Sequence, residues 1–409
     1  MSTFRHIAPS GTPIHLRTLL AWAKHSLRKK KNGAGLNNAI KEKFGIKHCF
    51  TISTGRAAMV VALRVFKEAN RDPQRTEVII PSYTCYSVAA SAELAGLKVR
   101  ICDINPKTLS YDTEQLKTVN FDNVLAIVTA NLYGLPNSLP EIELLAKKNS
   151  IYMLDDAAQC MNGKIAGRYV GTYGDIGLYS LDKGKNITTI QGGILVTNSD
   201  QIAELINNTL TSLPPPSRSE CIKDFIKLSI YTVLLRPWLY WIPARMPGLG
   251  LGQTEYTTDY PISLYNTHME GLAEILFNDI DAITSTRKDN YQQLRDAASK
   301  MPQLQLIKPF TETDPAYLRL PIIFNTNIER EAFIEQAHKH GISATLSYPL
   351  SLADLSEIKS FSTVHNDHAE GGRFIASHIV TLPTHGYMSD NDINITSKLL
   401  TQSSNGKID

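Results

Sequence analysis

The sequence predicts an α/β fold in which a mostly parallel β-sheet is covered by helices on both faces. Between residues 36 and about 200, short and continuously apolar runs alternate with stretches of helical periodicity. A strand that is apolar at every position is buried on both faces, and helices are the connections that parallel strands need. The expected strands are Val78–Ile80, Val99–Ile101, Val124–Val128, Ile151–Leu154 and Ile194–Val196, and the expected helices are Ala57–Lys67, Tyr86–Ala95 and Leu139–Lys148.

A second and smaller α/β unit is expected towards the C-terminus. The chain is divided into a basic amphipathic arm over 1–35, a large domain over 36–262 with an apolar, aromatic insertion at about 211–262, and a long helix with a small domain over 263–409. The elements expected in this last part are helix Met269–Ala298, strand Tyr317–Phe324, helix Glu329–His340, strand Ser343–Tyr348, helix Ala369–Ser377 and a final helix from Asp390.

The composition argues against several classes of function. The formal net charge is +3 over 409 residues, which is too small for a nucleic-acid surface, so no nucleic-acid partner is expected. The five cysteines are scattered without a CxxC pair, so neither a disulfide framework nor a metal site is expected. The first residues contain no apolar signal core, and we expect a cytoplasmic protein.

Asp156 and Lys185 are the candidate catalytic residues. Asp156 follows the apolar run Ile151–Leu154 and therefore lies at the carboxyl edge of the sheet, where such sheets bind ligands. A pyridoxal 5′-phosphate (PLP) site needs an acid that keeps a pyridine nitrogen protonated and a lysine that holds the aldehyde as a Schiff base. Alone, the acid is typical of a helix cap and the lysine of a solvated surface. The two in this order predict PLP as the cofactor.

A phosphate site is predicted from a second motif. Thr54, Gly55 and Arg56 directly precede a helix, whose free N–H groups and positive dipole end favour an anion. A plain N-cap has the same sequence, so this motif alone does not decide between the two interpretations. Ser180 lies five residues before Lys185 and adds a hydroxyl group that suits the same phosphate.

Taken together, these motifs resemble the DegT/DnrJ/EryC1/StrS family of sugar aminotransferases. The resemblance implies a fold-type-I PLP-transferase, with a mostly parallel seven-stranded sheet flanked by helices and a smaller C-terminal α/β domain. The matching landmarks extend from residue 36 to about 400 and are Ser53–Ala58, Ile80–Thr84, Asp103–Pro106, Leu132–Pro136, Asp155–Gln159, Gly171–Gly177, Ser180–Asn186, Gly192–Gly193, Tyr265–Met269, Ser347–Leu350 and Leu382–His385.

The resemblance also implies a role for each matching residue. Lys185 would form the Schiff base and then move the proton, and Asp156 would pair with the ring nitrogen. Gln159 would lie against the ring or its 3-hydroxyl group. The phosphate would be held by the backbone at Gly55 and by Ser180, and Asn266 would reach it across the interface of a homodimer.

The implied reaction is transfer of an amino group from an amino acid, most often glutamate, to a keto-sugar nucleotide in surface polysaccharide or glycan biosynthesis. Tyr348, His268 and His385 fall in landmarks that would contact substrate. The alternatives are a dehydratase, a lipid-linked acceptor, or a catalytically silent regulator at a membrane. Because the dehydratase branch carries histidine in place of the lysine, Lys185 favours the aminotransferase.

The sequence departs from the family pattern at several of these positions. Arg56 stands where many relatives have threonine, so only its backbone is expected to bind phosphate. Cys85 occupies the position of the ring-stacking aromatic, for which Tyr83 or Tyr86 would be the substitute. His268 replaces the usual arginine, which puts the substrate contacts there in question.

Two segments are additional to the family pattern. Residues 222–245 are apolar and aromatic with basic margins, and 14–31 is a basic amphipathic stretch. The former is interrupted by Arg236 and Pro237, so it does not span a bilayer, but both segments suit the anionic inner face of a membrane. The other interpretation is that they pack on the partner subunit or cover the active site.

Overall fold

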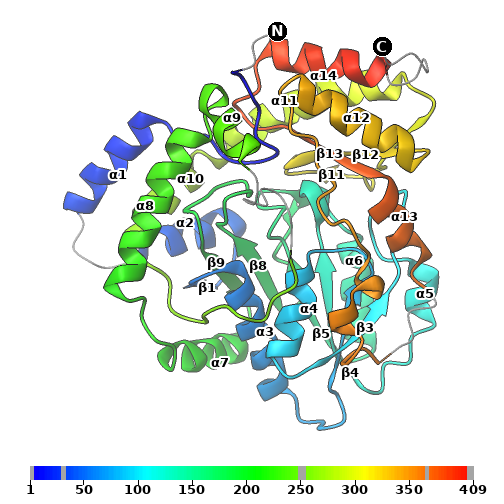
Figure 1. Cartoon of the computed structure of the whole chain (residues 1–409). Helices are drawn as coiled ribbons and strands as arrows, with labels where there is room; N and C mark the ends of the chain where they lie inside the picture. The colour runs from blue at the N-terminus through cyan, green and yellow to red at the C-terminus, as the bar shows by residue number, and fades with distance from the viewer. Residues whose placement is uncertain (1–3, 29–33, 247–254, 364–367, 403–409) are drawn as a thin grey trace.

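A computed structural model describes residues 4–28, 34–246, 255–363 and 368–402 (Figure 1). Its central sheet has seven strands in the order β1-β9-β8-β5-β4-β2-β3. The predicted α/β class is confirmed. The strands are β1 (His48–Ile52), β2 (Glu77–Pro81), β3 (Lys98–Cys102), β4 (Val124–Ala130), β5 (Tyr152–Asp156), β8 (Ile176–Ser180) and β9 (Gly193–Thr197).

Five neighbouring strands of this sheet, from β8 to β3, run parallel, whereas β9 and β1 are antiparallel to their neighbours. Asp156 pairs in register with Leu178 on β8, and Ala130 on β4 pairs with Asp156. The carboxyl ends of β4, β5 and β8 therefore meet at one edge of the sheet, which is the edge where ligands bind in such folds.

Helices cover both faces of the sheet. Successive strand residues point to opposite faces, so Val78 lies in one buried cluster and Ile79 in the other. The first face is covered by α3 (Gly55–Ala69), α4 (Tyr86–Leu94) and α7 (Asp200–Thr211), and the second by α2 (Ala34–Phe44), α6 (Leu139–Lys148) and α10 (Glu270–Asn278). A short helix, α5 (Thr113–Lys117), follows β3.

The C-terminal part contains a second sheet in the order β10-β12-β13, with both pairs antiparallel. A third small sheet, β11-β6-β7, joins this part to the large one. The elements are β10 (Leu304–Leu306), β11 (Thr313–Asp314), β12 (Arg319–Phe324), β13 (Ile379–Pro383), β6 (Lys164–Ile165), β7 (Arg168–Tyr169), α11 (Ile280–Ser299), α12 (Asn327–Lys339), α13 (Glu370–His378) and α14 (Asp390–Gln402).

Two expected elements are wrong. The strand expected at Ser343–Tyr348 is irregular, and only an isolated bridge joins Thr345 to Thr381 on β13. Ser347 has a φ of 62°, which no strand accommodates. The expected helix Met269–Ala298 is two helices, α10 and α11, because the backbone leaves helical geometry at Asp279.

The N-terminal arm and the insertion form three more helices, α1 (Leu16–Arg28), α8 (Arg218–Leu234) and α9 (Pro237–Arg245). They lie on one side of the large sheet (Figure 1). Ahead of α1 the chain is buried: Ile7 bridges to Ile342, and the His6 N–H donates to the Pro237 carbonyl at 2.8 Å. Lys29–Lys31 of the basic stretch, and 247–254 of the insertion, lie outside the described residues.

Candidate active site

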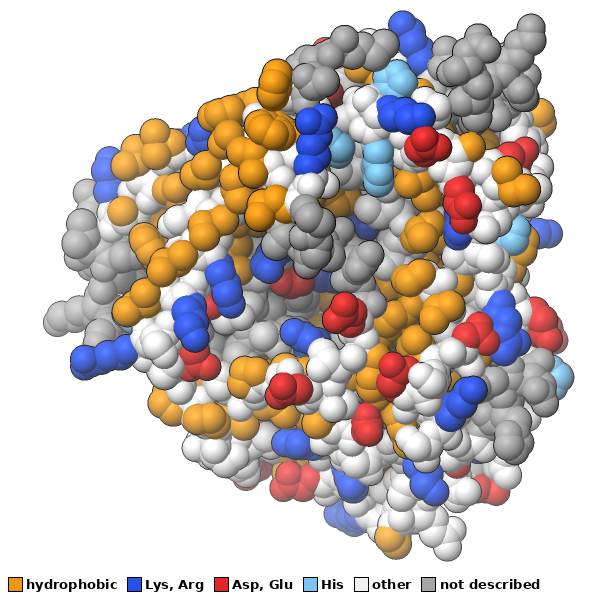
Figure 2. All heavy atoms as spheres, in the orientation of Figure 1, with side chains coloured by type: hydrophobic (Ala, Val, Ile, Leu, Met, Phe, Trp, Pro, Cys, Tyr) orange, Lys and Arg blue, Asp and Glu red, His pale blue; other side chains and the backbone are white. Residues whose placement is uncertain are grey.

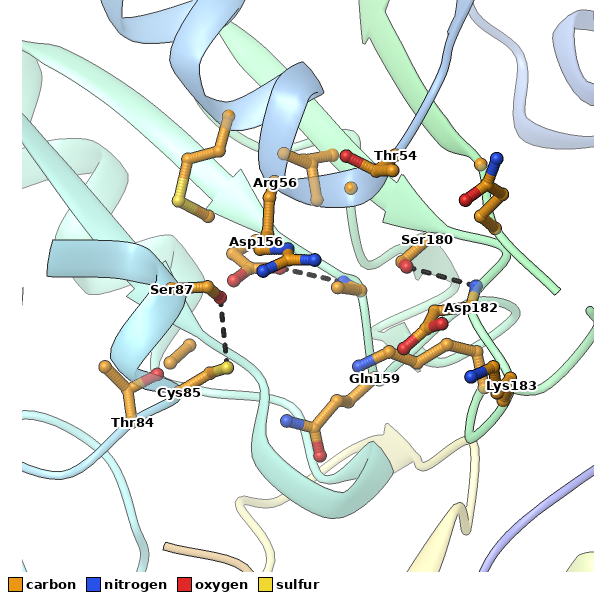
Figure 3. Close-up of a pocket in the computed structure, with 18 of the residues that line it drawn as sticks. Thr54, Arg56, Thr84, Cys85, Ser87, Asp156, Gln159, Ser180, Asp182 and Lys183 are labelled. Atoms are coloured by element: carbon orange, nitrogen blue, oxygen red, sulfur yellow. Dashed lines mark hydrogen bonds between the residues drawn. The ribbon is translucent and has the colours of Figure 1, made fainter. Parts of the chain in front are cut away.

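A cavity of about 450 Å³ lies at the carboxyl edge of the large sheet (Figure 3). It brings together residues from β5, the loop after β8 and the N-terminus of α3. Of the residues predicted for the site, Thr54, Gly55, Arg56, Cys85, Asp156, Gln159, Ser180 and Lys185 line it.

Asp156 is the last residue of β5, and its carboxyl group faces this cavity. One oxygen accepts a hydrogen bond from the Ala158 N–H at 2.9 Å, and no other donor of the described chain reaches the group. Burial raises the pKa of this carboxyl group, while the Ala158 N–H and the charge of Lys185 oppose the shift. A carboxylate in this setting gains from a cationic partner such as a protonated pyridine nitrogen.

Lys185 lies in the loop that follows β8, and its backbone is held from two directions. The Thr12 hydroxyl lies 2.8 Å from the Lys185 carbonyl and 2.7 Å from the Asn186 carbonyl. The Tyr231 hydroxyl on α8 donates to the Lys183 carbonyl at 2.9 Å and accepts from the Thr12 N–H at 3.0 Å. The N-terminal segment and the insertion thus fix the loop that carries the lysine.

The phosphate cup predicted at the start of α3 has suitable geometry. Thr54 is the N-cap, and its hydroxyl accepts from the Ala57 N–H at 3.0 Å. The N–H groups of the first helical turn have no acceptor within the helix and point towards the cavity. A Cβ atom on Gly55 would lie 2.9 Å from the Ser180 hydroxyl, so glycine is what allows α3 to begin this close to the end of β8.

The donor set fits PLP. First-turn N–H groups and a serine hydroxyl suit a phosphate ester, a buried carboxylate suits a ring nitrogen, and a lysine amine suits an aldehyde. Gln159 is fixed between two partners: its side chain accepts from the Tyr133 N–H at 3.0 Å and donates to the Tyr348 hydroxyl at 2.9 Å.

Arg56 and Cys85, the two residues of this cavity at which the sequence departs from the family pattern, both have defined contacts. The Arg56 guanidinium lies 4.6 Å from the ring centre of Tyr260, so its side chain stacks on an aromatic residue that lies between the insertion helices and α10. Cys85 faces the cavity and accepts a hydrogen bond from the Ser87 hydroxyl at 3.0 Å (Figure 3).

Tyr83 and Tyr86 do not line this cavity. The Tyr83 hydroxyl is 3.0 Å from that of Tyr133, and its ring packs edge-on against Tyr348. The Tyr86 hydroxyl accepts from the Leu350 N–H at 2.9 Å. Both tyrosines therefore join the large sheet to the C-terminal part, and the side chain at the stacking position is the thiol of Cys85.

The remaining predicted residues lie elsewhere. Asn266 is buried beside a small cavity that Thr54 also lines, and its amide donates to Asp224 on α8 at 3.1 Å. His268 is exposed, and its carbonyl accepts from the Trp22 ring N–H at 3.1 Å. His385 is 1% exposed and lies 2.9 Å from the Ala8 carbonyl, away from both large cavities.

A second cavity, of about 600 Å³, adjoins the first and shares Cys85, Gln159 and Lys185 with it. Tyr348, predicted to contact substrate, lines this second cavity. The residues that the sequence did not single out here are Tyr133, Lys183, Lys227, Tyr231 and Arg319.

Arg319 on β12 is the most informative of these. One nitrogen of its guanidinium contacts the hydroxyls of Thr345, Ser347 and Thr381 at 3.2–3.4 Å, and no described carboxylate is within ion-pair distance. Another nitrogen lies 3.8 Å from where a Cβ on Gly184, the residue before Lys185, would stand. A single basic residue on a strand gives no sequence signal, because its role depends on the loop that it faces.

The family model for the DegT/DnrJ/EryC1/StrS aminotransferase family matches residues 19–213 and 265–400 of this chain. The chain therefore belongs to this family, whose aminotransferases use PLP. The match omits 214–264, so α8 and α9 are outside the part that the family shares. Within the described residues, no group of His, Cys, Asp or Glu is arranged to hold a metal ion.

The curated relatives include two kinds of enzyme. GDP-4-keto-6-deoxy-D-mannose 3-dehydratase of Escherichia coli O55:H7 is 24% identical over 355 residues, which is 83% of this chain and 86% of that protein. GDP-perosamine synthase of Escherichia coli O157:H7 is 30% identical over 161 residues. That match covers 39% of this chain and 43% of the synthase. The match to GDP-4-keto-6-deoxy-D-mannose 3-dehydratase of Yersinia pseudotuberculosis also covers less than half of that relative, 42% of its length.

Solved structures show the same fold across nearly the whole chain. Helicobacter pylori PseC, an aminotransferase involved in pseudoaminic acid biosynthesis, superposes with a TM-score of 0.77 at 17% identity, covering 98% of this chain and 99% of that one. At this identity the likeness shows the fold alone.

Proposed function

We propose that this protein is a PLP-dependent aminotransferase that moves an amino group from an amino acid, glutamate in the first instance, to a keto-sugar nucleotide. The observation that carries this proposal is the placement of Asp156 and Lys185 on one cavity beside the N-terminus of α3. The aminotransferase branch is favoured over the dehydratase branch because the catalytic position is lysine and not histidine.

When bound, PLP supplies an aldehyde for covalent linkage to amines and a ring that accepts the electrons of a broken Cα–H bond. Asp156 would stabilise the proton on the ring nitrogen, since among the described residues its carboxylate accepts only from the Ala158 N–H. Lys185 would provide the amine that holds the proton taken from Cα of the substrate and returns it to the carbon of the cofactor's aldehyde. Ser180 and the first turn of α3 fix the phosphate and so the orientation of the ring.

Arg319 is suited to bind the carboxylate of the amino donor. A guanidinium presents a planar pair of donors that matches a carboxylate, and no carboxylate of the described chain already occupies them. Its position next to Gly184 would hold the donor with its amine towards Lys185.

Replacement of Lys185 tests the proposed activity. The purified wild-type protein should absorb visible light with PLP and lose this absorbance reversibly on addition of glutamate. Lys185→Ala should bind PLP without the covalent link, and its rate of amino transfer should fall by about a thousandfold or more. Reduction with borohydride followed by peptide mapping should place PLP on the peptide that contains Lys185.

The matched control is Lys98→Ala, which removes an exposed lysine on β3. It should retain the absorbance and the labelled peptide. Labelling of another lysine in the wild-type protein, or full retention of activity in Lys185→Ala with an unchanged circular dichroism spectrum, contradicts the proposal.

We also propose that the active unit is a homodimer, as the landmark containing Asn266 implies. Asn266 lies beside Thr54 in a small cavity close to the phosphate cup. Light scattering should give twice the chain mass of 45.4 kDa. A mass equal to one chain at working concentrations would count against this.

Contact with an anionic membrane is supported by one face of the molecule. Apolar side chains are exposed along α1, α8 and α9, and basic side chains border them (Figure 2). We call this surface the α1–α8–α9 face; its exposed apolar residues are Leu16, Leu20, Ile222, Phe225, Ile226, Ile230, Val233 and Trp238. No helix within the described ranges has the length and apolarity to cross a bilayer. Localisation at the inner face of a membrane, from the cytoplasm, stays a prediction.

Vesicle binding tests this proposal. The protein should sediment with vesicles of phosphatidylcholine containing about 30% phosphatidylglycerol, and less so at high salt. The double variant Ile226→Ser/Trp238→Ser should lose most of this binding, because these side chains are 51% and 58% exposed. Ile328→Ser, on exposed α12, is the control and should bind as the wild type does. Equal loss in both variants, or no sedimentation of the wild type, ends the proposal.

A further inference from the structure

The insertion builds one wall of the second cavity, on the side away from the C-terminal part. Ile230, Leu234 and Leu235 on and just after α8, and Pro243 on α9, line it. All four lie within 214–264, the segment that the family model omits. This wall is therefore a feature of this chain and not of the shared site.

The lining of this cavity changes from cationic to apolar with distance from Lys185. Lys183 lies two residues from Lys185, and Lys227 on α8 lines both cavities. Neither forms an ion pair with a carboxylate of the described chain, and Asp182 is the single acid among the described residues that line this cavity. An anion is therefore favoured next to the catalytic lysine.

The apolar part follows directly along the same helix. Positions separated by three or four residues share one face of a helix, so Lys227, Ile230 and Leu234 form a row. The row leads from the cationic end of the cavity to a wall without charge. A ligand that matches this order has a phosphate next to the reacting sugar and an aliphatic group beyond it.

The apolar wall also reaches the surface. Ile230 lines the cavity and is 52% exposed, so it belongs to both the cavity and the α1–α8–α9 face. Figure 2 shows this apolar face bordering the hollow at the centre of the molecule. An aliphatic chain longer than the cavity can therefore continue outward over apolar side chains instead of meeting water.

We propose that the amino acceptor carries an aliphatic chain close to its phosphate, and that the insertion binds this chain along Ile230 and Leu234. The proposal rests on the proposed aminotransferase function and specifies its acceptor. The chain has two possible sources: a lipid that carries the sugar through phosphate, or an acyl group on a sugar nucleotide. Both carry an anion and an aliphatic chain on one sugar, but only the lipid places the phosphate between the sugar and the chain, which is the order of the cavity lining.

Equilibrium binding to the PLP-loaded protein, measured by calorimetry, tests the proposal. The probes are inorganic phosphate, dodecyl phosphate below its micelle concentration, UDP-N-acetylglucosamine, and the same nucleotide with a dodecanoyl chain in place of acetyl. At least one chain-bearing probe should bind about tenfold or more tightly than its short partner, since burial of only a few methylene groups supplies that factor. Which probe gains identifies the source of the chain.

Two matched double variants locate the chain. Ile230→Ser/Leu234→Ser changes the cavity wall and should remove the gain. Leu144→Ser/Ile328→Ser changes side chains of α6 and α12 that are 69% and 80% exposed and belong neither to the two large cavities nor to the α1–α8–α9 face; it should keep the gain. Circular dichroism establishes that both fold.

Three results overturn the proposal: no chain-bearing probe gains over its short partner, the gain survives Ile230→Ser/Leu234→Ser, or both double variants lose it equally. The wild-type protein must in parallel lose visible absorbance with glutamate. If it does so without any preference for a chain, only the inference about the acceptor fails. If it does not respond to glutamate, the proposed function itself fails.

Discussion

His385 shows how a polar residue in a substrate landmark can serve packing. Its ring is buried against the Ala8 carbonyl, and burial lowers its pKa to about 4. The neutral ring therefore joins the N-terminal segment to the loop after β13. His385 lines neither of the two large cavities, so a contact with substrate, as the sequence suggested, stays a prediction.

A pH-dependent loss of stability follows from this burial. The folded pKa of about 4 lies below the value of about 6.5 for an exposed histidine, so between these values the unfolded chain binds more protons. Stability should fall as pH drops through this window, by about 2 kcal/mol from this residue at pH 5. Urea unfolding of His385→Gln should show a smaller decrease between pH 7 and 5 than the wild type. An equal decrease in both would assign the loss to other groups.

Backbone conformation at the cavities is also unusual at the level of single residues. Tyr133, Ile190 and Ser347 have φ values of 59°, 74° and 62°, in the left-handed region that side chains rarely adopt. All three line one of the two large cavities. Such conformations persist where the surrounding contacts hold them, and they often mark functional sites.

The common cavity of Asp156, Gly55 and Ser180 could be predicted from local sequence, whereas the places of other residues that line it could not. Asp156 ends a continuous apolar strand, and Gly55 and Ser180 occur in short motifs with a clear physical role, so their common cavity follows from the topology of parallel sheets. Arg319 and Lys227 reach the site from the second sheet and from the insertion. Their place depends on packing between elements that are distant in sequence.

At the level of elements, the two sides of α8 make different contributions, and the sequence of the helix does not show which residues belong to which side. One side exposes apolar residues, and the other contributes Tyr231, whose hydroxyl joins the Lys183 carbonyl and the Thr12 N–H. Asp224 on the same helix accepts from the side chains of Gln191 and Asn266, at 2.9 and 3.1 Å. Besides contributing Lys227 to both cavities, the helix therefore positions residues around them.

Removal of one hydroxyl tests this positioning role. Tyr231→Phe keeps the ring but loses both hydrogen bonds, which should lower the free energy of unfolding by about 1–2 kcal/mol. Because the lost bonds hold the loop of Lys185, the dissociation constant of PLP, measured by absorbance titration, should also rise several-fold. Tyr169→Phe is the control, since the Tyr169 hydroxyl forms no hydrogen bond within the described chain. A loss of stability with unchanged PLP affinity would mean a purely structural role.

The errors in predicted elements have local causes. The segment Ser343–Tyr348 has the alternating pattern of a strand, but Ser347 adopts a positive φ and turns the chain towards Arg319. The helix expected over Met269–Ala298 breaks at Asp279, where no proline or glycine signals the change. Tertiary contacts determine both the irregular backbone of Ser343–Tyr348 and the break at Asp279, and hydrophobic periodicity carries no information about such contacts.

At the scale of the whole molecule, the class of fold was predictable and the relation between its parts was not. Alternating apolar strands and helices predict a mostly parallel sheet, and the family resemblance implies that it has seven strands; the structure confirms both. The arm and the insertion are far apart in sequence, yet Trp22 on α1 lies 6.0 Å, ring centre to ring centre, from Phe225 on α8. Their joint surface is a property of the folded chain, and neither segment predicts it alone.

The two hydrogen bonds from Thr12 and Tyr231 have a consequence for the ancestry and engineering of this protein. Both residues lie outside the ranges shared with the family, 19–213 and 265–400, yet the hydroxyl groups of both donate hydrogen bonds to the backbone of the loop that contains Lys185. A chimera that receives α8 alone would gain the hydrogen bond from Tyr231 but would lack the one from Thr12. Transplanting the insertion into a relative therefore requires the N-terminal segment as well, and the two should be gained or lost together among close homologues.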